Sequence, residues 1–208
     1  MNYQKKDCGI SFSINCISTG WETFCFSFDN IKFHEFTTAS TVGAMLGKLL
    51  QLLYEIYIER NRIYLGEESD KAVQYICEDG GVIKQIIGEI TLDNEGQTLV
   101  LSVSRNINPN SKMLHIHLDY DYGEDLYDYQ VDMFDMFYAV SKGVTEIIKK
   151  TGICGYHFMT DWDNIDTMKF LQIKSLALTK ELIPLYKGEN DISYSSLQDE
   201  MGLLIFEM

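Results

Sequence analysis

The chain has 208 residues, of which 46% are hydrophobic and 12% aromatic, and only two are proline, so it has enough apolar material to bury a core of its own. This composition excludes a largely disordered chain. The 31 acidic residues outnumber the 17 basic ones, and the resulting net charge of −14 opposes direct binding to nucleic-acid phosphates or to anionic membrane surfaces.

The first 40 residues alternate between polar and apolar side chains. The apolar set of the first segment occupies every second position: Cys8, Ile10, Phe12, Ile14 and Cys16. A period of two is typical of a half-buried strand. Turn residues at 18–20 and at 29–30 separate this segment from two further extended segments, residues 23–28 and 31–36. The pattern predicts a three-stranded antiparallel meander.

The spacing then becomes helical. From Thr41 to about Arg60, the apolar positions recur every three or four residues: Val42, Met45, Leu46, Leu49, Leu52, Leu53, Ile56 and Tyr57. Thr41 is a suitable N-cap. A shorter helix is predicted from residue 69 or 70 to Glu78, before the glycine pair at 80–81.

A second meander is expected from residue 82, with strands at 82–92, 97–105 and 112–122. The apolar stripe from Met133 to Ile148 predicts a long helix over residues 126–150, which Gly152 ends. After it we expect a strand at 153–159, a helix at 163–177 with Asp163 as N-cap, and an edge strand at 202–206.

The element order βββα-α-βββα-βα predicts an α+β fold, in which two antiparallel β-meanders are each followed by a long helix. The helices are expected on one face of a mostly antiparallel sheet. We expect residues 1–208 to form a single domain, because no long linker interrupts the chain. Residues 1–66 and 67–160 are then pseudo-repeat halves, and residues 161–208 are a C-terminal extension.

The cysteines are odd in number and never occur as C-x-x-C: Cys8, Cys16, Cys25, Cys77 and Cys154. No hydrophobic signal segment precedes them. The longest apolar stretch, residues 42–58, contains Lys48, Gln51 and Glu55 and is short for a membrane span. We therefore expect reduced thiols in a cytoplasmic protein.

The acidic residues are unevenly distributed. More than half of the net charge falls within residues 119–166, and no lysine or arginine occurs between Lys112 and Lys142. This window contains Asp119, Asp121, Glu124, Asp125, Asp128, Asp132 and Asp135, together with Tyr122, Tyr127 and Tyr129.

If the helix begins near residue 126, the spacing of Asp125, Asp128, Asp132 and Asp135 places them on one helix face. Asp119 and Asp121 share the outward face of the preceding strand. These carboxylates would together form an acidic ridge with tyrosines among them. Such a ridge is either a solvated surface or a docking surface for a basic partner, in which tyrosines provide contact area.

The residue patterns that would support a catalytic or metal site are incomplete. His115, His117, Asp119 and Asp121 alternate on one strand, and His34 is a further potential metal ligand. Asp119-x-Asp121 fails as a calcium loop, because Gly123 and Gln130 occupy ligand positions. A dyad of Cys25 and His34 is conceivable, although nothing in the sequence activates the thiol. We expect the polar strand face to be structural and the chain to need no metal or cofactor.

The sequence thus favours a non-enzymatic acidic inhibitor that neutralises a basic protein, most plausibly a bacterial immunity protein directed against a toxin. A phage anti-defence protein, or mimic of nucleic acid, has the same character. The alternative of another class is an enzyme with a metal or thiol site. The oligomeric state stays open.

Overall fold

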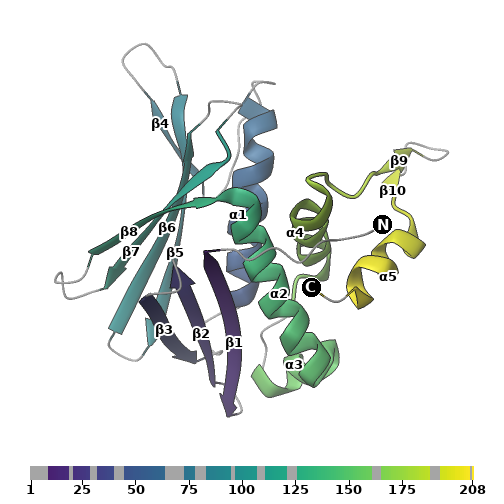
Figure 1. Ribbon diagram of the computed structural model, residues 1–208, viewed down its shortest axis with the longest axis horizontal. Helices are drawn as coiled ribbons and strands as arrows, with labels where there is room; N and C mark the ends of the chain where they lie inside the picture. The colour runs from purple at the N-terminus through teal and green to yellow at the C-terminus, as the bar shows by residue number, and fades with distance from the viewer. Residues whose placement is uncertain are drawn as a thin grey trace.

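A computed structural model describes residues 9–18, 21–28, 32–39, 45–63, 73–77, 83–94, 97–106, 111–120, 126–160, 165–187, 193–206 and 208. Its fold is α+β, with antiparallel sheets and with helices packed against them, as the sequence predicts (Figure 1). Two meanders, each followed by a long helix, are confirmed.

The first sheet has three strands in sequence order: β1 (Ile10–Ser18), β2 (Trp21–Phe28) and β3 (Lys32–Ala39). Register places Phe12 opposite Phe26, and Phe26 opposite His34. Because directly paired residues share a sheet face, these side chains line one inner face, and all three are buried. The alternation of polar and apolar residues therefore produces the expected half-buried sheet.

The second sheet has five strands, also in sequence order: β4 (Val73–Cys77), β5 (Ile83–Asn94), β6 (Gln97–Asn106), β7 (Met113–Tyr120) and β8 (Leu126–Asp132). Its inner face carries buried Ile90, Leu101, Val103, Ile116 and Leu118. Polar residues alternate with these along each strand, so the second face points away from the core.

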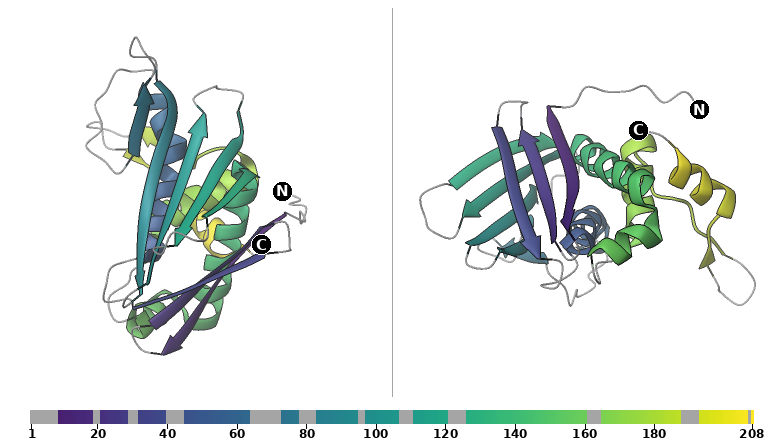
Figure 2. Two further views of the ribbon diagram at one scale, coloured as in Figure 1. Left: turned by 90° about the vertical axis from the view of Figure 1, so that its left-hand side faces the viewer. Right: turned by 90° about the horizontal axis from the view of Figure 1, so that it is seen from below.

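The helices are α1 (Met45–Ile63), α2 (Met133–Thr151), α3 (Ile153–Thr160), α4 (Thr167–Thr179) and α5 (Leu197–Ile205). A two-stranded ribbon, β9 (Tyr186–Lys187) with β10 (Ser193–Tyr194), precedes α5. In the left-hand view of Figure 2, α1 lies behind the five-stranded sheet. Helix α2 packs on β1 and on α4, and α5 lies at the end of the molecule farthest from the five-stranded sheet (Figure 1).

Two glycines allow the helices to approach the sheets closely. A Cβ at Gly143 of α2 would lie 2.7 Å from the backbone oxygen of Phe12, and a Cβ at Gly88 of β5 would overlap Leu52 Cδ1. Between the two sheets, the rings of Phe28 and Tyr129 stack with centroids 4.1 Å apart. One hydrophobic cluster therefore draws on both sheets and on α1, α2 and α4.

Several predicted elements are wrong in type. Residues 126–132 form strand β8, so the long helix begins only at Met133. Strand β4 replaces the predicted helix near residues 70–78. Helix α3 replaces the predicted strand at 153–159, and α5 replaces the edge strand at 202–206.

The start of one helix also differs from the prediction. Asp166, rather than Asp163, caps α4, because its carboxylate accepts a hydrogen bond from the backbone N–H of Lys169 at 3.1 Å. Thr41 and Asp163 lie outside the described residues, and α1 is described from Met45.

No helix in the described part of the chain is long and apolar enough to cross a lipid bilayer.

Candidate functional site

The structure describes six of the ten residues predicted to form the acidic ridge: Asp119, Tyr127, Asp128, Tyr129, Asp132 and Asp135. The remaining four, Asp121, Tyr122, Glu124 and Asp125, lie outside the described residues. The six belong to three elements: Asp119 to β7, residues 127–132 to β8, and Asp135 to the first turn of α2. The ridge therefore depends on how these elements meet.

The predicted helix face does not exist, because Asp128 lies on a strand. Asp132 has the role of N-cap of α2: its Oδ1 accepts hydrogen bonds from the backbone N–H groups of Phe134 at 2.9 Å and Asp135 at 3.3 Å. Asp135 lies in the first turn, where the helix dipole favours a carboxylate. Both acids therefore have a structural role at the start of α2.

Tyr127 and Tyr129 lie on the inner face of β8. Tyr129 pairs with Ile116 and Tyr127 with Leu118, and both of these partners are fully buried. The hydroxyl of Tyr129 lies 2.6 Å from Nε2 of buried His34 on β3. These two tyrosines join the two sheets, so the prediction that they alternate with the carboxylates on a contact surface is wrong for them.

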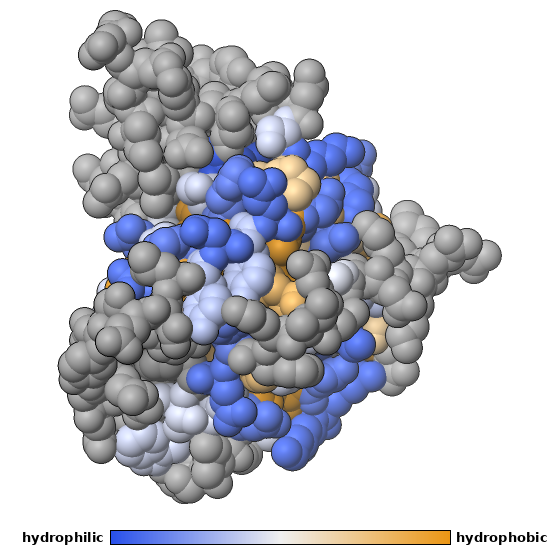
Figure 3. All heavy atoms as spheres, turned by 60° about the vertical axis from the view of Figure 1, so that its left-hand side comes forward, coloured by the Kyte–Doolittle hydropathy of each residue, from blue (hydrophilic) through white to orange (hydrophobic). Residues whose placement is uncertain are grey.

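The opposite face of the second sheet carries the carboxylates. We call it the outer sheet face; its residues whose side chains are described are Glu89, Thr91, Val100, Ser102, Ser104, Met113, His115, His117, Asp119, Asp128, Gln130 and Asp132. None of them is a lysine or an arginine. Figure 3 turns this side of the molecule forward, and hydrophilic residues dominate its coloured surface.

A row of four polar residues crosses this face. Register aligns Glu89, Ser102, His117 and Asp128 on β5, β6, β7 and β8. The Ser102 hydroxyl donates to Glu89 Oε1 at 3.1 Å, and His117 Nδ1 lies 2.7 Å from Asp128 Oδ1. The Asp128 side chain is still 81% exposed. These bonds hold the row in a fixed arrangement that remains open to solvent.

The row has the residue types of a hydrolytic triad without the required alignment. A serine nucleophile must share its hydrogen with the histidine, yet Ser102 donates to Glu89. Both described pockets lie elsewhere, one between α4 and α5 and one inside the core. The arrangement therefore fits recognition by charge better than nucleophilic catalysis.

The residues considered above for a metal site or a thiol dyad do not lie close together either. His34 lies on the inner face of the first sheet, whereas His115, His117 and Asp119 lie on the outer sheet face, so these four residues do not converge. Among the described residues, no group of three or more His, Cys, Asp or Glu side chains could hold a metal ion.

Cys25 pairs with Ser13 and Glu35, on the face of the first sheet opposite to His34, so the two side chains cannot form the dyad considered as an alternative above. Burial and the neighbouring Glu35 carboxylate raise the pKa of the Cys25 thiol, which lowers its thiolate fraction.

The sequence reading missed Glu89 and Ser102, which lie far from residues 119–135 in the chain. Their signal was the alternation in residues 88–93 and 101–104, which places them on the polar face but does not give the register. No family model, curated protein or solved structure matches the chain.

Proposed function

We propose that the chain is a non-enzymatic binding protein, which covers a basic surface of a partner protein with the outer sheet face. In the biological setting that fits its composition, the partner is a toxin and the chain is a cytoplasmic bacterial immunity protein. The observation that supports this proposal is a set of carboxylates from three strands, of which Glu89 and Asp128 are exposed and Asp119 is half-buried, on a face with no lysine or arginine among the residues whose side chains are described.

A sheet is a suitable frame for such a surface. Cross-strand hydrogen bonds fix the relative positions of the carboxylates before binding, so little conformational entropy is lost when the partner arrives. A negative field of this kind also speeds diffusional encounter with a basic protein. Because the inner face is filled with core side chains, the outer sheet face can meet a partner without rearrangement.

The test compares two double variants that remove the same charge. Asp119→Asn with Asp128→Asn alters the outer sheet face, and Glu35→Gln with Glu146→Gln alters exposed carboxylates on β3 and α2. Wild-type protein is used to capture a binding protein from the source cells, and the Kd of that purified protein is then measured against each variant.

We expect the captured protein to be basic and its affinity to fall with added salt. The outer-face variant should raise the Kd about tenfold, since two exposed charge pairs contribute on the order of 1–2 kcal/mol. The control variant should change it little. Equal Kd values for the two variants would contradict the proposal. Capture of a nucleic-acid-binding defence effector would assign an anti-defence role instead.

A further inference from the structure

Helix α5 presents an apolar stripe to solvent. Leu197, Met201 and Ile205 follow one another at intervals of four residues and are 70%, 48% and 71% exposed. Leu203 and Leu204 of the same helix pack partly against the core. No residue of α5 is buried, although more than half of its residues are apolar. A contiguous exposed stripe of this kind is typical of an interaction site.

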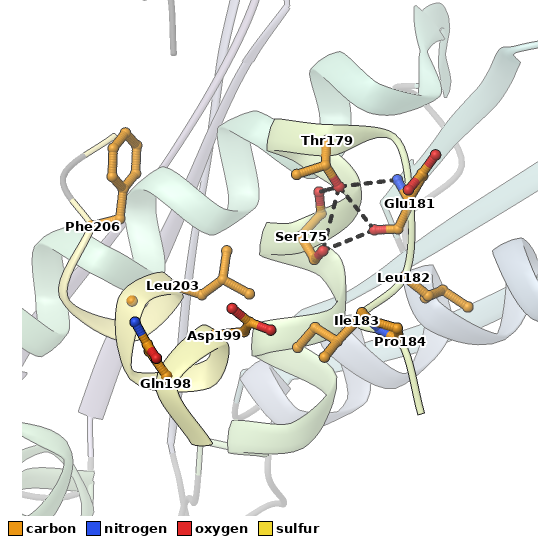
Figure 4. Close-up of a pocket in the computed structure, with 11 residues that line it drawn as sticks. Ser175, Thr179, Glu181, Leu182, Ile183, Pro184, Gln198, Asp199, Leu203 and Phe206 are labelled. Carbon is orange, nitrogen blue, oxygen red and sulfur yellow. Dashed lines mark hydrogen bonds between the residues drawn. The ribbon is translucent and has the colours of Figure 1, made fainter. Parts of the chain in front are cut away.

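A pocket of about 500 Å³ adjoins this helix, between α5, the C-terminal half of α4 and residues 181–184 (Figure 4). Its apolar lining comes from Leu182, Ile183, Pro184, Leu203 and Phe206. The Asp199 side chain extends from α5 toward α4 across this space (Figure 4). The volume is within the range of natural ligand sites, about 300–1,000 Å³.

The charged side chains that line the pocket are all acidic. Glu181 and Asp199 line it, Glu200 follows on α5, and neither the pocket lining nor α5 contains a lysine or arginine. No described lysine or arginine pairs with the Asp199 or Glu181 carboxylate. The nearby Lys174 is fully buried, where it donates to Thr145 Oγ1 and the Phe206 carbonyl. A second copy of this chain would bring like charges together, which disfavours self-association here.

We propose that α5 and the pocket beside it form a docking site for a basic amphipathic segment of a partner protein. The apolar face of that segment covers the Leu197–Met201–Ile205 stripe, in the manner of a helix laid along an apolar surface. The aliphatic stem of one of its lysine or arginine side chains enters the pocket, and the cationic end pairs with Asp199. This site lies across the molecule from the outer sheet face, so it is a second surface (Figure 1).

Gly202 permits a direct test of the pocket. It lines the pocket, and a Cβ added there would meet nothing within 4 Å, so a larger side chain can occupy the space without a clash. Gly202→Met fills the pocket, and Gly202→Ala is its matched control. The probes are two helical peptides of about 14 residues, roughly four turns, one of leucine and lysine and the other of leucine and glutamine.

We expect the wild type and Gly202→Ala to bind the lysine peptide alike, and Gly202→Met to bind it at least about tenfold more weakly. Asp199→Asn should lower affinity for the lysine peptide about fivefold, toward that for the glutamine peptide. Met201→Gln with Ile205→Gln should weaken the binding of both peptides. The outer-face variant Asp119→Asn with Asp128→Asn should leave lysine-peptide binding unchanged, which separates this inference from the proposed function.

Four results would overturn the inference. Equal lysine-peptide affinity of Gly202→Met and Gly202→Ala would show that the pocket is not used. Loss of lysine-peptide binding in the outer-face variant would mean that the peptide binds to the outer sheet face. If monodansylcadaverine, a small fluorescent amine, binds as tightly as the peptide, the pocket is a site for free amines. A wild-type dimer in sedimentation that Met201→Gln with Ile205→Gln dissociates would identify a second copy as the occupant.

Discussion

At the residue scale, Lys174 is the group whose ionisation the fold changes most clearly. Its ammonium is fully buried, donates to Thr145 Oγ1 at 3.0 Å and to the Phe206 carbonyl at 2.7 Å, and lies 5.5 Å from the centre of the Phe170 ring. Burial, helped by the charge of Lys149, lowers the pKa of Lys174 from 10.5 to about 8. The lysine therefore links α2 and α4 to the C-terminal segment at some cost in desolvation.

This shift gives a pH-dependent stability. Below about pH 8 the lysine is charged in both states, so its contribution is constant. Between about pH 8 and 10.5 the unfolded chain holds more protons, so the free energy of unfolding rises with pH. Over this pH range the free energy of unfolding of the wild type should rise by on the order of 2–3 kcal/mol relative to that of Lys174→Met. Denaturant unfolding of both proteins at several pH values checks this, and a difference that stays constant or falls would contradict it.

At the element scale, the boundary between β8 and α2 depends on Asp132. The residues before it alternate in polarity, and those after it have helical spacing. Its carboxylate caps the new helix through the N–H groups of Phe134 and Asp135. One side chain thus ends a strand pairing and begins a helix, which explains why a charged residue is placed there.

Replacing this cap should destabilise the protein. Asp132→Ala is expected to lower the free energy of unfolding by about 1 kcal/mol, and Asp132→Asn by less, because an amide oxygen still caps. The measurement is the midpoint of urea unfolding. Asp128→Ala, on the same strand, is the control for loss of a carboxylate, and an equal effect of the two alanine variants would argue against capping.

Two helical glycines should respond to alanine in opposite ways. At Gly143, the new Cβ would lie 2.7 Å from the Phe12 backbone oxygen and 2.8 Å from its Cδ1, so α2 must move away from β1. We expect a loss of about 1–3 kcal/mol. At Gly202 the Cβ meets nothing within 4 Å, and alanine should add up to about 1 kcal/mol through helix propensity. Thermal unfolding of each variant measures both effects, and a stabilised Gly143→Ala would contradict the observed packing.

At the scale of the whole molecule, the net charge of −14 acts against the compact state. The carboxylates of the outer sheet face lie on a sheet whose inner face belongs to the hydrophobic cluster shared with the helices. The fold therefore separates a dense apolar interior from an acidic exterior, and repulsion within that exterior must be offset by core burial.

Screening should relieve this repulsion. Raising the sodium chloride concentration from about 10 to about 150 mM shortens the Debye length from roughly 30 to 8 Å, so the Tm should rise by a few degrees. The Asp119→Asn with Asp128→Asn variant, having fewer negative charges, should show a smaller rise. A Tm that falls with salt would mean that attractive ion pairs outweigh the repulsion.

The sequence by itself determined the α+β class, the first meander, the strands at 83–106 and 113–120, and the buried stripes of α1 and α2, because binary periodicity reports directly which face is buried. The sequence also contains signals for strand β8 and for the start of helix α5. Tyr127, Tyr129 and Val131 alternate with polar residues as in a strand, and Ser196 stands three residues before Asp199 as in a capping box. The apolar run of α3 has no period that separates helix from strand.

Only the tertiary structure decided which distant residues meet. Strand register brings Glu89 and Ser102 into one row with His117 and Asp128, and sheet pairing separates Cys25 from His34 by placing them on opposite faces. The pocket beside α5 joins residues from α4 and α5 in the same way. Periodicity fixes a side chain relative to its own element, whereas register and packing depend on contacts between segments far apart in the chain.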